Sequence, residues 1–182
     1  MTRTVAVYGG SFNPPHVVHT MVASYVLSAY PVDEVLVVPT GQHPFAKDLT
    51  PHEDRVQMCM LAMRHLASVE VSSIEAELPT PSLTLRTLEE LQARMPGAAL
   101  RFVLGSDLLP ETPKWHAFDR IRELAPLIVI GRAGHPSDEA PGPLLPELSS
   151  TQVRALLRQG HSAEGYVDLQ VARYIEQRGL YR

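Results

Sequence analysis

The chain has 182 residues, of which 45% are hydrophobic, and this suits one globular domain with an ordinary buried core. Its formal net charge of -4 argues against a protein that coats nucleic acid or an acidic membrane, because those partners select basic surfaces. A single cysteine, Cys59, excludes a disulfide within the chain, and no apolar run approaches the roughly 20 residues that span a bilayer. We therefore expect a cytoplasmic protein without nucleic-acid or membrane partners.

Strands and helices are predicted to alternate along the chain. Short apolar runs predict strands at residues 5–8, 35–38, 100–104 and 127–130, and a weaker pattern predicts a fifth strand at residues 69–71. Helical patterns cover residues 16–30, 50–66, 85–95 and 115–124, and two further helices are expected from Ser149 and from Asp168. Between Arg132 and Leu148 the chain is rich in Pro and Gly, which predicts a long loop.

Capping patterns mark three of the predicted helix ends. Thr50-Pro51-His52-Glu53 combines a capping Thr, a Pro at the first helical position and a Glu at the reciprocal capping position. Ser149 and Gln152 repeat the spacing of a capping box. Gly179 is expected to end the last helix.

The alternation predicts an α/β fold with a doubly wound parallel sheet. We expect a single domain, 1–182, in which residues 1–148 form the α/β core and residues 149–182 form a small C-terminal helical appendage. Such sheets bind ligands beyond the carboxyl ends of their strands. Candidate chemistry should therefore follow the five strand ends, at Tyr8, Val38, Val71, Leu104 and Ile130.

The strongest candidate site follows the first strand, in Gly9-Gly10-Ser11-Phe12-Asn13-Pro14-Pro15-His16-Val17-Val18-His19. Two glycines are expected to allow a sharp turn and a close approach of a ligand to the backbone. The helix that begins near His16 offers free N–H groups to a phosphate. His16 and His19 are three residues apart, so both imidazoles are expected to face the same anion.

This segment resembles the signature of the nucleotidyltransferase superfamily that uses a His-x-x-His pair, and the chain as a whole resembles the bacterial nicotinate mononucleotide adenylyltransferases. Six further pieces follow in the family's order: Lys47 with Glu53-Asp54-Arg55, Ser82-x-Thr84-x-x-Thr87, Gly105-Ser106-Asp107, Lys114-Trp115-His116, Ser149-Ser150-Thr151-x-x-Arg154 and Tyr174-Ile175-x-x-x-Gly179-Leu180-Tyr181. The resemblance implies a Rossmann-like nucleotidyltransferase fold. It also implies adenylyl transfer from ATP to nicotinate mononucleotide, which gives deamido-NAD and pyrophosphate in NAD biosynthesis.

The resemblance implies roles for individual residues on the ATP side. The expected ATP-binding residues are Gly9, Gly10, Ser11, Phe12, His16, His19, Gly105, Asp107, Ser150, Thr151 and Arg154. Three of them, His16, His19 and Arg154, are expected to act in catalysis, with His19 donating a hydrogen bond to the α-phosphate. The backbone at Ser11 and Phe12 would hold that phosphate. Mg²⁺ is expected to arrive with ATP, since the sequence shows no cluster of metal ligands.

The expected mononucleotide site consists of Lys47, Thr84, Thr87 and Trp115. Lys47 would meet a phosphate, Trp115 would stack on the pyridine ring, and Thr87 would recognise its carboxylate or amide. Plain structural roles stay open for Lys47 as a loop lysine and for Trp115 as a core side chain. Several positions depart from the common family pattern, and most lie on the pyridine side: Asn13, Val18, Ala46, Leu83 and Arg86.

Two other functions stay open on the sequence alone. A sister nucleotidyltransferase would act on nicotinamide mononucleotide or on another phosphorylated acceptor, such as phosphopantetheine. A nucleotide-binding regulator would have lost catalysis, but the presence of His16, His19 and Arg154 argues against that loss. The sequence does not decide between a monomer and a homo-oligomer.

Overall fold

A five-stranded parallel sheet forms the centre of the computed structural model, which describes residues 2–42 and 49–182. The strand order is β3-β2-β1-β4-β5, and every pairing is parallel. The strands are β1 (Thr4–Gly10), β2 (Glu34–Pro39), β3 (Val69–Val71), β4 (Ala99–Gly105) and β5 (Leu127–Ile130). The predicted doubly wound α/β fold is confirmed.

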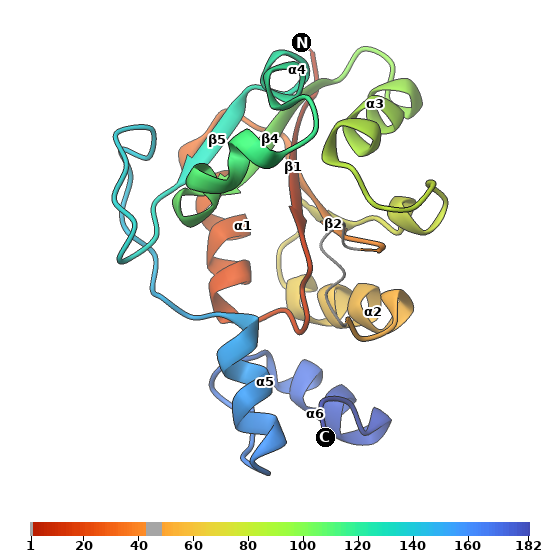
Figure 1. Ribbon diagram of the computed structural model, residues 1–182, viewed down its shortest axis with the longest axis vertical. Helices are drawn as coiled ribbons and strands as arrows, with labels where there is room; N and C mark the ends of the chain where they lie inside the picture. Colours follow the sequence, from red (N-terminus) through yellow and green to blue (C-terminus); the bar gives the residue numbers. More distant parts are fainter. Residues whose placement is uncertain (1, 43–48) are drawn as a thin grey trace.

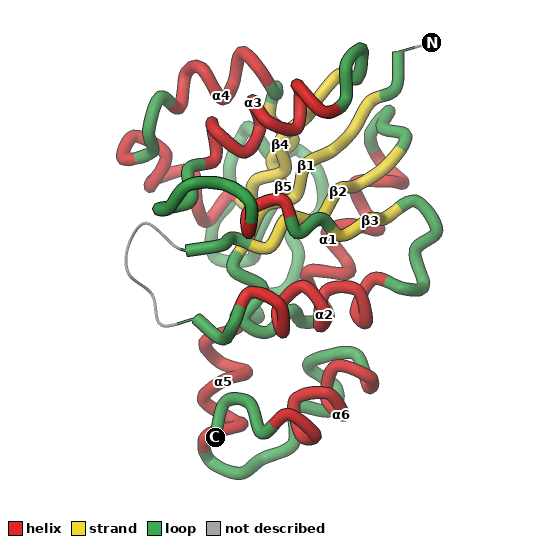
Figure 2. Tube along the Cα trace, turned by 90° about the vertical axis from the view of Figure 1, so that its right-hand side faces the viewer, coloured by secondary structure: helices red, strands yellow, loops and turns green. Residues whose placement is uncertain are grey.

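Helices cover both faces of this sheet (Figures 1 and 2). One face carries α1 (Val17–Ala29) and α2 (His52–Met63), and the other carries α3 (Thr84–Arg94) and α4 (Phe118–Leu124). Side chains alternate between the two faces along each strand, since successive residues of a strand point in opposite directions. In β1, Ala6 packs on the α1 side, whereas Val5 and Val7 pack on the α3 side.

The last two helices, α5 (Ser150–Arg158) and α6 (Leu169–Arg178), lie beside α2 at the lower end of the molecule in Figure 1. A small apolar core joins them to α2, with Val153, Val171 and Ile175 packed against Met58 and Ala62. The Ser149–Gln152 capping box and the end of α6 at Gly179 are both as predicted. In the described residues, no helix is both long and apolar enough to cross a bilayer.

The predicted capping of α2 by Thr50 is wrong. The helix begins after Pro51, and no side chain caps it. The backbone of Thr50 is used in tertiary contacts instead: its carbonyl accepts from Arg55 Nε at 2.8 Å, and its N–H donates to Asn13 Oδ1 at 3.4 Å. The helix also ends at Met63, earlier than the predicted residue 66.

The helix predicted over residues 115–124 begins later than expected. Residues Ser106–Lys114 form a 3₁₀ helix, η2, and α4 starts only at Phe118. Pro110 and Pro113 lie inside η2 and cannot donate the backbone hydrogen bonds of an α-helix. Ala117, with φ 50°, adopts a left-handed conformation that separates the two helices. A second short 3₁₀ helix, η1 (Ile74–Ala76), was not predicted.

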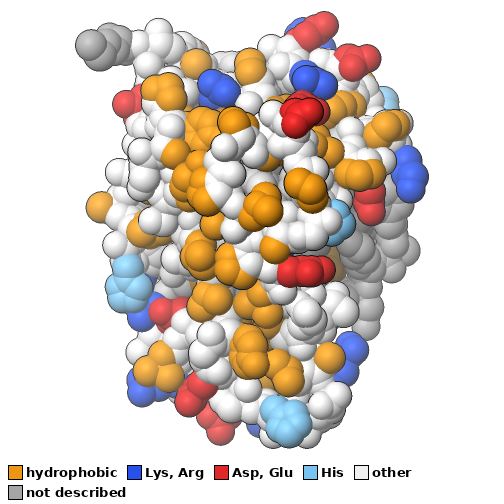
Figure 3. Space-filling view, turned by 90° about the vertical axis from the view of Figure 1, so that its left-hand side faces the viewer, with side chains coloured by type: hydrophobic (Ala, Val, Ile, Leu, Met, Phe, Trp, Pro, Cys, Tyr) orange, Lys and Arg blue, Asp and Glu red, His pale blue; other side chains and the backbone are white. Residues whose placement is uncertain are grey.

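Hydrophobic side chains form a band on the face shown in Figure 3. The exposed apolar residues of the described chain include Val17 and Met21 on α1, Leu144 in the long loop and Tyr166 before α6. The backbone N–H of Val17 donates to the carbonyl of Tyr166 at 2.9 Å. This hydrogen bond joins the start of α1 to the segment before α6.

Candidate active site

The candidate site lies where the strand order reverses. Strands β2 and β3 extend from β1 in one direction, whereas β4 and β5 extend in the other. Ligands of doubly wound folds bind at this switch point, beyond the carboxyl ends of the strands. Two cavities open there, one of about 560 Å³ and one of about 370 Å³, and both are lined by Gly9, Gly10, Ser11 and Trp115.

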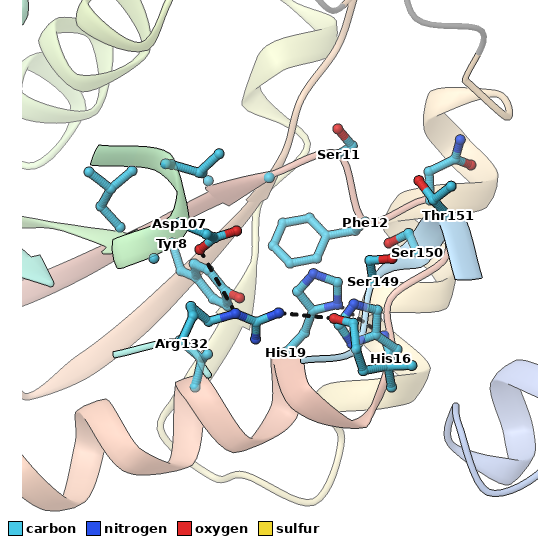
Figure 4. Close-up of a pocket in the computed structure, with 18 of the residues that line it drawn as sticks. Tyr8, Ser11, Phe12, His16, His19, Asp107, Arg132, Ser149, Ser150 and Thr151 are labelled. Carbon is cyan, nitrogen blue, oxygen red and sulfur yellow. Dashed lines mark hydrogen bonds and ion pairs between the residues drawn. The ribbon is translucent and has the colours of Figure 1, made fainter. Parts of the chain in front are cut away.

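The larger cavity brings together all eleven residues expected to bind ATP. They come from the end of β1, the start of α1, the end of β4 and the start of α5: Gly9, Gly10, Ser11, Phe12, His16, His19, Gly105, Asp107, Ser150, Thr151 and Arg154. Figure 4 shows this convergence, with the stacked histidines below Phe12 and the start of α5 beside them.

The turn after β1 is made by Phe12 rather than by the two glycines. Strand β1 continues through Gly10, and the positive φ of 45° falls on Phe12. The prediction that the glycines make the sharp turn is therefore wrong. Gly10 is needed for close approach instead, since a Cβ there would lie 3.1 Å from the Phe12 ring, tighter than ordinary contact.

His16 and His19 form a stacked pair, with ring centroids 3.7 Å apart and planes at 27°. His16 is the N-cap of α1 and has an extended backbone, so it lies outside the helix and does not share the expected helix face with His19. The two rings are brought together by the capping arrangement at the start of α1. The backbone N–H of His16 donates to His19 Nδ1 at 3.0 Å. Because Nδ1 is an acceptor, the neutral ring of His19 carries its proton on Nε2.

Both histidines are neutral near pH 7. Burial, with the positive charge of Arg132, lowers the pKa of His16 to about 4. Burial also holds the pKa of His19 well below its usual range, with smaller contributions from His16 and Arg132. His16 Nδ1 is buried and has no hydrogen-bond partner among the described residues. The pair can therefore offer neutral N–H donors to an anion.

Positive charge dominates the lining of the larger cavity. Arg132, Arg154 and Arg158 line it, and Asp107 is the one acidic side chain among its described lining residues. The first turn of α5, at Ser150 and Thr151, also faces it and holds no acidic residue. In the first turn of α1, the N–H groups of Val17 and His19 already donate to the carbonyls of Tyr166 and His16. Free N–H groups at helix N-termini attract anions. The arrangement suits a ligand with several negative charges.

Asp107 folds back over Gly105. A Cβ at Gly105 would lie only 2.3 Å from Asp107 Oδ1, so the carboxylate occupies space that any larger residue would take. Arg132 Nε lies 3.8 Å from the same oxygen. Asp107 therefore stands at the rim of the cavity as an acceptor, where it can meet the hydroxyl groups of a ribose.

The smaller cavity brings together Thr84, Thr87 and Trp115. The Trp115 ring is held edge-to-face by Phe102 and Phe118, at centroid distances of 6.1 and 5.9 Å. Trp115 thus packs against the core and still lines both cavities, so its two interpretations are compatible. The third mononucleotide contact, Lys47, lies outside the described residues.

Thr87 makes a contact that the sequence did not suggest. Its hydroxyl donates to the buried carboxylate of Glu75, whose other oxygen accepts from the Gly41 N–H at 3.3 Å. Thr84 is placed differently, at the start of α3, where no side chain caps the helix and the first turn holds no acid. Thr84 and its neighbouring N–H groups are therefore better placed than Thr87 to meet a carboxylate.

Sequence reasoning missed three cations of the site region. Arg132 follows β5 by two residues, so the rule that ligands bind at strand ends would have identified it. Arg158 lies one helical turn beyond Arg154 and lines the same cavity. Arg55 was noted only as part of a motif, but it is 99% buried behind the β1–α1 turn. No sequence signal shows that Arg55 reaches this turn, because its partners are backbone carbonyls.

Comparison with known proteins shows the family of this chain. The model of the cytidylyltransferase-like family matches residues 7–156, from β1 into α5. A probable nicotinate-nucleotide adenylyltransferase of Anaeromyxobacter dehalogenans strain 2CP-1 is 50% identical, over 99% of this chain and 97% of the relative. The chain belongs to this family of nicotinate-nucleotide adenylyltransferases.

Other family members agree over nearly the whole chain. The similarly described protein of Myxococcus xanthus is 43% identical over 97% of this chain and 94% of its own length. Among solved structures, the Plasmodium falciparum nicotinic acid mononucleotide adenylyltransferase complexed with NaAD superposes with a TM-score of 0.83. It covers 98% of this chain and 97% of that chain at 22% identity, so it supports the nucleotidyltransferase fold.

Proposed function

We propose that this protein transfers the adenylyl group of ATP to nicotinate mononucleotide, which gives deamido-NAD and pyrophosphate for NAD biosynthesis. The observation that carries the proposal is the pair of cavities that meet at Gly9, Gly10 and Ser11. The larger cavity offers cations, the free N–H groups of the Ser11–Phe12 turn and the N-terminus of α5 to a triphosphate. The smaller one offers an aromatic ring and the N-terminus of α3 to a pyridine carboxylate.

ATP would lie in the larger cavity with its α-phosphate at the Ser11–Phe12 turn. The free N–H groups of this turn and Nε2–H of His19 would donate to the α-phosphate oxygens. His16 would lie beside them on the phosphate chain. Arg132, Arg154 and the start of α5, at Ser150 and Thr151, would hold the β and γ phosphates.

Arg154 and Ser150 also hold the turn itself. Arg154 Nη1 donates to the carbonyl of Asn13 at 2.7 Å, and Ser150 Oγ donates to the carbonyl of Pro14 at 2.9 Å. A second Arg154 nitrogen, Nη2, donates to Thr151 Oγ1 at 3.3 Å. We infer that these residues bind the leaving group and keep the phosphate-binding turn in place together.

Nicotinate mononucleotide would occupy the smaller cavity, with its ring on Trp115 and its carboxylate at the N-terminus of α3 near Thr84. A neutral amide gains less than a carboxylate from a helix N-terminus, so this placement favours nicotinate over nicotinamide. Thr87 would contribute through Glu75 rather than directly. Lys47 stays a proposed phosphate contact on the resemblance alone.

In the reaction, a phosphate oxygen of the mononucleotide forms a bond to the α-phosphorus of ATP. At the same time, the bond between the α-phosphorus and the oxygen that bridges it to the β-phosphorus breaks, and pyrophosphate leaves with that oxygen. The nucleophile is already an anion, so no general base is required. Catalysis then depends on positioning and on stabilising charge at the α-phosphate, which neutral N–H donors fixed in a low-dielectric site do well. Mg²⁺ would enter with ATP and offset the negative charge of the leaving pyrophosphate.

The test is pyrophosphate release with ATP and Mg²⁺, measured in parallel with nicotinate and nicotinamide mononucleotides. In the presence of ATP, we expect turnover with nicotinate mononucleotide. With nicotinamide mononucleotide we expect a kcat/KM that is at least about tenfold lower. Turnover on another phosphorylated acceptor only would reassign the substrate to a sister enzyme. Nucleotide binding without turnover on any acceptor would favour a regulator. A cytoplasmic location stays a prediction.

A further inference from the structure

Arg55 is a buried cation that lines neither cavity, yet it contacts the backbone of the phosphate-binding turn. It lies on α2 and is 1% exposed. Its guanidinium donates to three carbonyls from separate segments: Ser11 at 2.9 Å, Gly41 at 3.1 Å and Thr50 at 2.8 Å. No carboxylate among the described residues forms an ion pair with it.

Burying a cation without a paired anion is costly, and an apolar side chain would fill the same space at lower cost. Burial lowers the pKa of Arg55, as expected for a guanidinium removed from water. Three hydrogen bonds fix the plane of the guanidinium in one orientation. Such a costly burial is explained if Arg55 has a task besides filling the core, and its contact with Ser11 indicates which task.

The carbonyl of Ser11 and the N–H of Phe12 belong to one planar trans peptide group, so they point in opposite directions. Since Arg55 holds the Ser11 carbonyl on the buried side, the Phe12 N–H is turned to the side of the larger cavity, which Ser11 and Phe12 line. The preceding peptide group is held in the same way. The Thr40 N–H donates to the Gly10 carbonyl at 2.8 Å, so the Ser11 N–H of that peptide group points away from Thr40. Neither the Ser11 nor the Phe12 N–H has a partner among the described residues.

The turn would not keep this orientation by itself. Phe12 has φ 45°, a conformation that costs free energy in any residue with a side chain and persists only where the surroundings enforce it. Arg55 supplies that constraint from behind the turn. Its charge also polarises the peptide group that it holds, and this strengthens the N–H donor on the other side.

We propose that Arg55 is a positioning residue for adenylyl transfer: by holding the Ser11 carbonyl, it fixes the Phe12 N–H as a hydrogen-bond donor to one non-bridging oxygen of the α-phosphate. The proposal rests on the proposed function for the identity of the reaction. Arg55 touches neither substrate, and it acts through the backbone of Ser11 and Phe12.

The test uses Arg55→Lys, which keeps the charge but cannot hold three carbonyls in one plane. Arg55→Gln, without the charge, is the second variant. The matched control is Arg64→Lys, the same change near the end of α2, where Arg64 donates to Asp168 at 2.6 Å and lies away from both cavities. Circular dichroism and urea unfolding establish that each variant is folded at the assay temperature.

We expect Arg55→Lys to lower kcat by about 10- to 100-fold while the KM for ATP changes less than about threefold, because the donor matters most as charge builds on the phosphate. A stereochemical readout separates positioning from stability. The two α-phosphorothioate diastereomers of ATP replace one or the other non-bridging oxygen with sulfur. The wild-type protein should discriminate between them, and Arg55→Lys should lose most of that discrimination, whereas Arg64→Lys should retain it.

A second readout needs no turnover, so it distinguishes failure of this proposal from failure of the proposed function. ATP should shift the amide resonance of Phe12 in ¹⁵N-labelled wild-type protein and in Arg64→Lys, but not in Arg55→Lys or Arg55→Gln. Folded Arg55 variants that keep both the wild-type diastereomer preference and the Phe12 shift would overturn the proposal. Absence of wild-type turnover with an intact Phe12 shift would overturn only the assigned reaction.

Discussion

His19 has two hydrogen-bonding tasks on one imidazole ring. Nδ1 accepts from the His16 N–H at the start of α1, and this leaves the Nε2 proton for the substrate phosphate. The first task is structural and the second catalytic. Substitutions that imitate one nitrogen at a time can therefore separate them.

His19→Asn places an amide oxygen near the position of Nδ1, so it should keep the N-terminal contact of α1 while removing the donor. His19→Ala removes both. We expect both variants to lose about 10²- to 10³-fold in kcat, the usual effect of removing one preorganised donor. Only His19→Ala should also lose about 1 kcal/mol of stability. Steady-state kinetics and urea unfolding measure the two effects, with the exposed His161→Ala as control.

The stacked histidines also predict how stability depends on pH. The pKa of His16 is about 4 in the folded protein, whereas a histidine in an unfolded chain has a pKa near 6.5. Between these values the unfolded state binds more protons, so stability should fall as pH decreases through this window and level off above it. For His16 alone the full effect is on the order of 3 kcal/mol.

The measurement compares urea midpoints of wild-type protein and His16→Asn from pH 7.5 to 4.5. The gap between the two proteins should change steadily below about pH 6.5, because the depressed pKa of His16 is present only in the wild-type chain, whereas burial depresses the pKa of His19 in both. Curves that stay parallel over the whole range would contradict a buried neutral His16.

At the scale of secondary-structure elements, the end of β4 determines where Asp107 lies. Gly105 leaves the space that the Asp107 carboxylate fills, and a Cβ there would lie 2.3 Å from Oδ1. The carboxylate is at the end of a short side chain and 37% exposed, so it can rotate away without disturbing the core. A substitution at Gly105 should therefore affect ligand binding more than folding.

We expect Gly105→Ala to raise the KM for ATP by about 10- to 100-fold, the loss of hydrogen bonds to a charged group, with little change in thermal midpoint. The double variant Gly105→Ala/Asp107→Ala should be no worse than Asp107→Ala alone, since both changes remove the same carboxylate. Additive effects in this cycle would show that Gly105 acts independently of Asp107.

For the whole molecule, the C-terminal helices are joined both to α2 and to the site. Tyr174 and Arg178 donate to the buried Asp54 of α2 at 2.7 and 3.0 Å. Tyr181 donates to Asn13 Oδ1 at 2.7 Å, directly in the turn after β1. We propose on this ground that the α/β core and the two helices unfold together as a single domain.

Ile175→Ala tests this proposal. Ile175 is 3% exposed in the core between α6 and α2, so its truncation should cost about 2–4 kcal/mol. Trp115 reports on the distant α/β core, and its fluorescence transition in urea should shift by the same free energy as the circular dichroism transition. Leu169→Ala, at an exposed position of the same helix, should shift neither. An unmoved Trp115 transition would indicate two independent units.

Features that depend on neighbouring residues could be predicted from the amino-acid sequence alone. Apolar runs marked four of the strands, and Val69 and Val71 on either side of Glu70 marked the short strand β3. The Ser149–Gln152 spacing and Gly179 marked helix ends that form as expected. These features are local, since propensity, periodicity and capping act within one or two turns. The order of the motifs likewise identified the family and eleven of the residues that line the larger cavity, but not Arg132 and Arg158.

Features that depend on residues distant in the sequence became visible only in the folded chain. Thr50 does not cap α2 because Arg55 and Asn13 engage its backbone, and Thr87 faces Glu75 across 12 positions of the chain. The positive φ falls on Phe12, not on a glycine, because Arg55, Arg154 and Ser150 hold the carbonyls around it. Such contacts leave no periodic pattern in a sequence, because their partners lie far apart along the chain and all but the Thr87–Glu75 contact end on a backbone group that any residue could supply.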